Sequence, residues 1–244
     1  MPGRKRLLVV GGAVLLTGLV VMFPARVLHA WLSPPGVELS GIEGSVWSGR
    51  ASAARVGGAY LANLRWSFRP LALFTGRLSY RVEAEPPGGF VDAELTTGLG
   101  GLRLPALRAA VPLSAFAGVA PLADISGEVS LQLEDVVLRD GWPVRLHGQA
   151  GISGLLVRAL AAEPLGDYRA EFASEDETIT GSVEDLRGML DVAATLTLAP
   201  DRSYSLVGRV AANATAATSV VEQLRFLGSA DARGLREFRL EGSL

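Results

Sequence analysis

The feature that most constrains this chain is an alternation of apolar and polar residues from residue 37 onward. Leu64, Trp66 and Phe68 form one such run, and similar runs recur as far as residues 236–240. A period of two is typical of strands with one buried and one wet face. Turn-forming segments separate the runs at roughly 8 to 15 residues, the spacing of an antiparallel meander. The sequence therefore predicts a mainly β domain over residues 37–244, built on an antiparallel, curved sheet.

A few short helices interrupt the strand pattern. Arg69–Gly76 and Val111–Gly118 each have a proline near the start and a glycine at the end, and Thr218–Gly228 has apolar residues at helical spacing. Helices this short can cover only the ends or edges of a sheet. Glycine supplies 29 of 244 residues, about 12% against a usual ~7%, which favours many turns and bulges over long helices.

Residues 1–32 have the pattern of a short cytoplasmic tail and a transmembrane signal anchor. Arg4, Lys5 and Arg6 precede an uncharged apolar run from Leu7 to Phe23. A helix of that length spans about 25 Å, short of a hydrocarbon core of ~30 Å. The apolar residues that lead to Trp31 can extend it, and a tryptophan suits the membrane interface.

The orientation of this anchor follows from its charges. The positive-inside rule places the three cations in the cytoplasm and the bulk of the chain across the membrane. A cleaved signal peptide is the alternative, but Leu28-His29-Ala30 has leucine where a cleavage site needs a small residue. The chain has no cysteine, so we expect the outer domain to depend on core packing instead of disulfides.

Charge and motif searches predict neither catalysis nor a cofactor. Residues 31–244 carry 19 basic and 25 acidic residues without a cationic cluster, which argues against nucleic acid as a partner. His29 and His147 have no second histidine or cysteine at ligand spacing, so no metal site is expected. The glycines of 98–101 are followed by Arg103 where a dinucleotide loop needs its third glycine. The acidic run Glu175–Glu177 is interpreted as a solvated hairpin tip.

One stretch, VELSGIEGSVWSGRA at residues 37–51, departs from simple alternation. Gly44 and Gly49 give the backbone the freedom to bend, and Trp47 lies between them. The simplest interpretation is a β-bulge in which Trp47 fills the space that the bend opens. An exposed Trp47 that contacts a partner protein is the alternative.

The same stretch resembles a known family. Its block, which has the form hydrophobe-x-G-x-x-G-x-x-W-S-G-x-A, is followed by a W-x-x-x-P-L block. The matching positions include Gly41, Gly44, Trp47, Ser48, Gly49, Trp66 and Pro70. This arrangement resembles the protein N family of bacterial type II secretion systems, and looser similarity continues to residues 226–242.

The resemblance implies a non-enzymatic, single-pass subunit of the bacterial inner membrane with most of its chain in the periplasm, where it serves as a β scaffold for protein export. It implies partners among the inner-membrane platform proteins L, M and C, with the outer-membrane secretin as a further candidate. We expect the last strand, Arg236–Leu240, to lie at a sheet margin and to pair with other chains there.

Two alternatives remain open. A membrane-tethered sheet could shield acyl chains in an apolar groove, as in AsmA-like and Lpt-type periplasmic proteins, so lipid is a possible ligand. A periplasmic hydrolase with a dispersed triad is the other. The shape of the apolar face separates the first two hypotheses: a closed or helix-capped sheet favours a scaffold, and an open trough favours lipid transfer.

Overall fold

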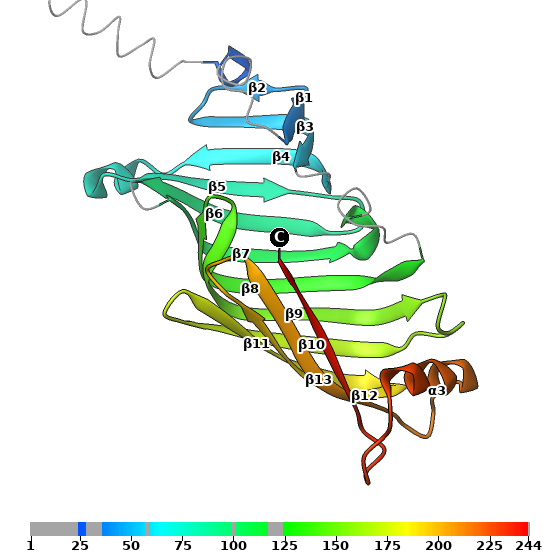
Figure 1. Ribbon diagram of the computed structural model, residues 1–244. Helices are drawn as coiled ribbons and strands as arrows, with labels where there is room; N and C mark the ends of the chain where they lie inside the picture. The colour runs from blue at the N-terminus through cyan, green and yellow to red at the C-terminus, as the bar shows by residue number, and fades with distance from the viewer. Residues whose placement is uncertain (1–23, 28–35, 57–58, 99–100, 117–123, 244) are drawn as a thin grey trace, which may run out of the picture.

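The computed structural model describes residues 24–27, 36–56, 59–98, 101–116 and 124–243, and its main feature is one long β-sheet (Figure 1). The fourteen strands are β1 (Val37–Ser40), β2 (Glu43–Gly44), β3 (Ser48–Val56), β4 (Ala59–Phe68), β5 (Leu78–Ala84), β6 (Phe90–Gly98), β7 (Gly101–Pro112), β8 (Ile125–Arg139), β9 (Trp142–Val157), β10 (Gly166–Glu175), β11 (Thr178–Gly188), β12 (Leu190–Leu198), β13 (Ser203–Ala212) and β14 (Arg236–Ser243). The predicted mainly β fold is confirmed.

The sheet is an antiparallel meander. From β3 to β14 each strand pairs with the next in the chain, and β1 and the two-residue β2 both pair with β3. The predicted meander is therefore confirmed. In Figure 1 the middle strands run across the view and β14 crosses them steeply, so the sheet twists strongly along its length.

Side-chain contacts between distant turns show how strongly the second half of the sheet curves. The indole Nε1–H of Trp142, just after the β8–β9 turn, donates to the carbonyl of Ala199 at 3.0 Å, in the β12–β13 turn. Arg202 from the same later turn donates to the carbonyl of Asp140 at 3.2 Å. Three strands separate β9 from β13 in the sheet. These bonds therefore connect strand ends that would lie far apart if the sheet were flat.

One face of this sheet is apolar from end to end. Strand register aligns one residue per strand from β3 to β14 in a single row: Gly49, Trp66, Val82, Ala93, Leu107, Leu133, Gly148, Phe172, Gly181, Leu196, Leu206 and Leu240. A second row on this face runs from β5 to β14: Ala84, Val91, Ala109, Leu131, Ala150, Ala170, Val183, Ala194, Gly208 and Phe238.

The opposite face is polar along the same length. The row between the two apolar rows contains Arg50, Arg65, Glu83, Asp92, Arg108, Gln132, Gln149, Glu171, Ser182, Thr195, Val207 and Arg239, with Val207 as its single apolar member. The period of two in the sequence therefore separates the faces over the whole sheet, as expected for strands that keep a common register.

The short helices lie at strand ends. They are the 3-10 helices η1 (Pro70–Thr75), η2 (Leu113–Phe116) and η3 (Arg225–Leu227), and the α-helix α3 (Thr218–Leu224). Val220 of α3 is 2% exposed and packs with Ala161 and Leu165 of the β9–β10 connection. In contrast, η1 buries none of its residues, and Phe74 is 89% exposed. Each of the three predicted helical segments contains a helix, but Val111 and Pro112 of the second segment belong to β7.

The predicted membrane anchor falls almost wholly outside the described residues. Arg4, Lys5, Arg6, Leu7, Phe23 and Trp31 all lie outside them. In the part of the chain that the structure describes, no helix combines the length and the apolar character needed to cross a membrane. The anchor stays a prediction from the sequence.

Candidate interaction surfaces

The glycine-rich stretch forms a tight hairpin between β2 and β3. Gly44 pairs with Gly49 and has φ +92°, a conformation that favours glycine. A Cβ added to Gly44 would lie 2.6 Å from the carbonyl oxygen of Ser48. The amide of Ser48 in turn donates to the hydroxyl of Ser45 at 3.2 Å. The bend therefore requires glycine at position 44 and is closed by local hydrogen bonds.

Trp66 holds this hairpin against β4. Its indole ring occupies the space that a side chain at Gly49 would need, and its Nε1–H donates to the carbonyl of Ser45 at 3.1 Å. A Cβ at Gly49 would also lie 2.6 Å from the carbonyl oxygen of Glu43. Position 49 is thus closed to side chains from both directions. The two sequence blocks of the family resemblance meet at this contact.

Trp47 packs against Phe68, two residues along β4 from Trp66. Its ring meets Phe68 edge-on, with centroids 4.8 Å apart and planes at 60°, and Phe68 lies 5.3 Å from Tyr80. The amide of Phe68 donates to the carbonyl of Trp47 at 2.6 Å. Trp47 is only half-buried, and burial raises the pKa of the Tyr80 hydroxyl. An aromatic series therefore continues from the hairpin into β5.

The remaining family positions also serve local structure. Gly41 has φ +65° and lies beside Ser52, whose hydroxyl donates to the carbonyl of Ser40 at 3.0 Å. Pro70 begins η1, where a missing amide hydrogen costs nothing. These positions carry hydrogen-bonding and packing groups and no acid, base or nucleophile pair, so their contacts are those of structural support.

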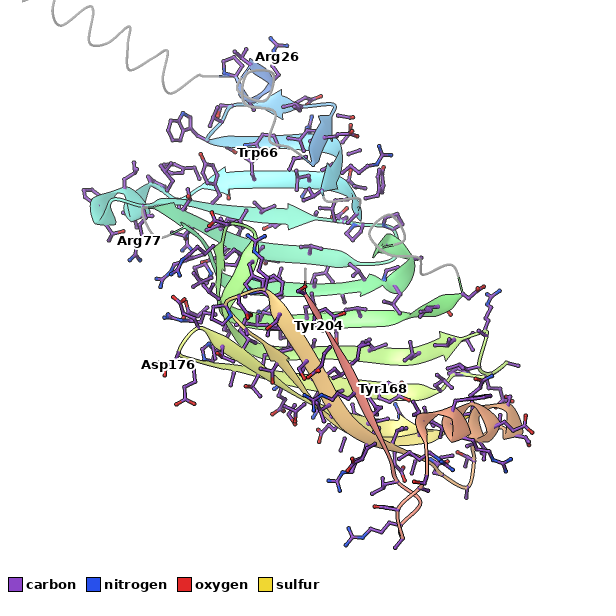
Figure 2. All side chains as sticks on the ribbon, in the orientation of Figure 1. Arg26, Trp66, Arg77, Tyr168, Asp176 and Tyr204 are labelled. Carbon is purple, nitrogen blue, oxygen red and sulfur yellow. The ribbon has the colours of Figure 1, made fainter. Side chains whose placement is uncertain are left out.

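A polar cavity of about 700 Å³ lies along the strand ends on one side of the sheet, from β5 to β11. It is lined by Arg77, Arg103, Arg139 and Arg145, together with Asp176 and Glu177 of the β10–β11 turn. Figure 2 shows Arg77 and Asp176 on this side.

Two of the four arginines in this cavity are neutralised. Arg139 pairs with Glu177 at 2.9 Å, and Arg145 pairs with Asp135 at 3.2 Å. These carboxylates leave the cavity close to neutral in charge. No group of metal-ligating side chains occurs within the described ranges.

The two margins of the sheet differ in their protection. The amino-terminal margin is made of the four-residue β1 and the two-residue β2, so it offers little strand for pairing. The carboxy-terminal margin is β14, eight residues long and paired along its length with β13 without a bulge. Among the described strands β14 pairs only with β13. The predicted position of the last strand at a sheet margin is confirmed.

Comparison with known proteins decides what kind of chain has this sheet. A family model described as "Type II secretion system (T2SS), protein N" matches residues 35–239, from the start of β1 into β14. The chain belongs to the type II secretion system protein N family. It is therefore a component of a type II secretion system with no enzymatic activity of its own, and so a protein of the cell envelope.

Two relatives of this family match nearly the whole chain. The "Type II secretion system protein N" of Vibrio cholerae serotype O1 is 27% identical over 244 residues, which cover 95% of each chain. The protein of the same name from Aeromonas hydrophila is 24% identical over 245 residues, which cover 93% of each chain. No solved structure matches the chain.

Sequence reasoning missed two features of these surfaces. It predicted a β-bulge in which Trp47 fills the space that the bend opens, whereas the stretch forms a hairpin between β2 and β3 and the ring beside Gly49 is that of Trp66 in β4. It also did not predict the arginine-lined cavity, because these arginines are far apart in the sequence and come together only when the strand ends align. The pairing of Gly49 with Trp66 becomes visible only once the β3–β4 register is known.

Proposed function

We propose that this protein is an inner-membrane subunit of the secretion system that holds its neighbours together through a periplasmic β-sheet, without turnover. In this proposal residues 1–32 form the cytoplasmic tail and the anchor, and residues 37–244 form the periplasmic domain. Its neighbours are the platform proteins L, M and C, with the secretin as a further candidate.

The observation that carries the proposal is the open margin at β14. A strand with unpaired amide and carbonyl groups can accept a strand from another chain, and main-chain hydrogen bonds supply the affinity. From Glu237 onward β14 alternates, with Phe238, Leu240 and Gly242 on the apolar face and charged residues at 237, 239 and 241 on the other. An added strand would need to continue both faces, which gives specificity to the pairing.

The motif around Gly44, Gly49 and Trp66 has a supporting role in this proposal. It forms a short hairpin at the amino-terminal margin, in which the ring of Trp66 covers Gly49. This margin is the end of the sheet nearest the anchor in sequence. A rigid first hairpin would fix the position of the sheet relative to the anchor. We assign the motif no contact with substrate.

Site-specific crosslinking in intact secreting cells tests the proposal. Glu237 and Arg239 are exposed on β14, so a cysteine or a photoreactive residue at either position should crosslink to another subunit of the secretion system. The same probe at Glu43 in β2 is the control, because β2 lies at the blunted margin. The absence of any β14 crosslink in secreting cells would reject strand addition there.

The apolar face supports a second candidate function, the binding of lipid. The two apolar rows extend across the sheet while the short helices lie at strand ends, and among the large described side chains only Ile179 is less than 2% exposed. An apolar sheet face without a second layer is the feature that lipid-handling proteins need.

Mass spectrometry of the purified chain separates this second candidate from the scaffold. Phospholipid that co-purifies in stoichiometric amount and is lost in a variant such as Leu133→Glu would support lipid binding, because Leu133 lies in the middle of the first apolar row. The matched control is Gln132→Glu, one residue away on the polar face. Equal lipid content in both variants would exclude the face as the binding site.

A further inference from the structure

β14 lacks several of the devices by which natural sheets prevent edge pairing. Its sequence, REFRLEGS, has no proline and no lysine, and its register with β13 has no bulge. Leu240 is 56% exposed although it belongs to the apolar row. The single inward-facing charge is Arg236, at the first position of the strand. A partner strand can therefore approach along the rest of β14.

The charges of β14 define which partner fits. On the polar face Glu237, Arg239 and Glu241 stand in that order, and Arg239 already contacts Glu241 at 2.5 Å within the strand. A strand that pairs antiparallel with β14 should place an acid opposite Arg239 and a base opposite Glu241. On the apolar face it should place an apolar side chain opposite Leu240.

A second copy of β14 meets these requirements. We propose that two copies of this chain pair through antiparallel β14 strands, with Leu240 opposite Leu240 of the other copy. In that register Arg239 of each copy lies opposite Glu241 of the other, and Phe238 lies opposite Gly242. The overlap runs from position 237 to position 243, nearly the whole strand.

This register preserves both faces of the sheet. A two-fold axis perpendicular to the sheet keeps the apolar face of each copy on the same side. The first apolar row then runs from Leu206 through Leu240 into Leu240 and Leu206 of the second copy. An aromatic ring opposite a glycine also occurs within the chain, where Trp66 faces Gly49 and Phe172 faces Gly181.

Neighbouring registers fit less well. If the axis passed through Arg239, that residue would face Arg239 of the other copy and Glu237 would face Glu241 in both directions, so three like-charge pairs would form. If it passed through Phe238, residues 241–243 would extend past the paired strand, which begins at Arg236. Of the three registers, the one at Leu240 combines opposite charges with an overlap of nearly the whole strand.

A single-cysteine scan of the full chain in membranes tests the register, and the chain has no native cysteine to interfere. Leu240→Cys should form a disulfide-linked dimer under mild oxidation. Arg239→Cys and Glu241→Cys should each crosslink poorly when expressed alone. They should crosslink efficiently when a copy with Arg239→Cys and a differently tagged copy with Glu241→Cys are expressed together. Self-crosslinking of Arg239→Cys that exceeds that of Leu240→Cys would overturn the register.

Charge exchange tests the recognition itself. Arg239→Glu and Glu241→Arg should each weaken the dimer about tenfold in sedimentation of the full chain in detergent, because each opposes like charges twice. The double variant should restore it. The melting temperature of each variant serves as the control for folding, since both side chains are exposed. A double variant as weak as the single ones would overturn the proposal.

The inference rests on the proposed role of β14 as the docking margin, and crosslinking distinguishes their failures. If the Leu240→Cys variant links only to a different secretion subunit, the homodimer is excluded and the scaffold proposal stands. If no cysteine on β14 links to any protein in secreting cells, both are excluded.

Discussion

The indole of Trp66 covers Gly49 of the neighbouring strand and donates a hydrogen bond to the carbonyl of Ser45 at 3.1 Å. This contact joins the β2–β3 hairpin to β4. It explains why a tryptophan and a glycine are needed 17 positions apart in the sequence. The pairing of an aromatic ring with a glycine on an adjacent strand is a known way to fill a sheet face.

Each of two changes at this contact should lower the free energy of unfolding. Gly49→Ala should cost about 1–3 kcal/mol, because its Cβ would meet both the ring and a backbone carbonyl. Trp66→Phe should cost about 1–3 kcal/mol, since it leaves the Ser45 carbonyl without its donor and reduces the ring. Denaturant unfolding of the purified chain, followed by circular dichroism, measures both. Gly76→Ala cannot serve as the control, because Gly76 has a positive φ and an alanine there would be strained. Ala53→Gly in β3 serves instead.

Trp47→Ala should cost about 2 kcal/mol. This is less than the roughly 3–5 kcal/mol typical of a tryptophan in a full core, because the Trp47 ring is half-buried and meets Phe68 edge-on. A double-mutant cycle with Phe68→Leu should give a coupling of about 0.5–1.5 kcal/mol. A melting temperature that does not change would mean instead that Trp47 serves an external contact.

Acid should remove a specific contribution from Asp167. Its carboxylate accepts from the amide of Gly154 at 2.8 Å and from Arg187 at 3.0 Å. These bonds lower its pKa below the ordinary 3.8, the amide of Gly154 contributing most. Because the folded state binds this proton more weakly than the unfolded state, the contribution is present above the ordinary pKa and is lost as pH falls through the folded one.

The corresponding measurement compares Asp167→Asn with the native chain across pH. The variant should melt at a lower temperature at pH 7, and the difference should shrink as the pH falls below 3.8. Asp191→Asn, at an exposed position, is the matched control. A difference that stays constant from pH 7 to pH 3 would show that the carboxylate charge is not what matters at Asp167.

The predicted anchor gives a topology prediction. A reporter fused after the last residue should be active in the periplasm, and an amino-terminal tag should remain on the mature chain, because the cations of residues 4–6 stay in the cytoplasm. Mass spectrometry of the membrane-bound protein checks the second point. A mature chain that begins near Ala30 or Trp31 would replace the anchor with a cleaved signal peptide.

The sequence predicted those features that depend on local periodicity. Alternation such as Leu64, Trp66 and Phe68 places successive side chains on opposite faces whatever the partner strand, so the sheet and its apolar face could be predicted. Two helical segments could be predicted from proline and glycine at their ends, and the third, Thr218–Gly228, from apolar residues at helical spacing. The marginal position of the last strand followed from the meander itself.

Features that depend on register could not be predicted. Which ring lies on Gly49 is decided by the pairing of β3 with β4. The bond from Trp142 to Ala199 links residues 57 positions apart, and it depends on the accumulated twist and curvature of several strands. Periodicity does not determine which residues of neighbouring strands pair. A shift of one strand by two residues leaves every side chain on the same face, so it satisfies the same sequence pattern.

The most direct test of the account is secretion by cells in which the chain carries Leu240→Lys. A lysine in the apolar row of an edge strand is a natural block to strand addition, and Leu240 is 56% exposed, so the chain should still fold. Leu186→Lys is the matched control, because Leu186 is 48% exposed in β11, which does not pair with β14. We expect Leu240→Lys to lose secretion of folded exoproteins and its β14 crosslinks, and Leu186→Lys to keep both. Normal secretion by a stably folded Leu240→Lys protein would contradict the proposal that β14 is the docking margin.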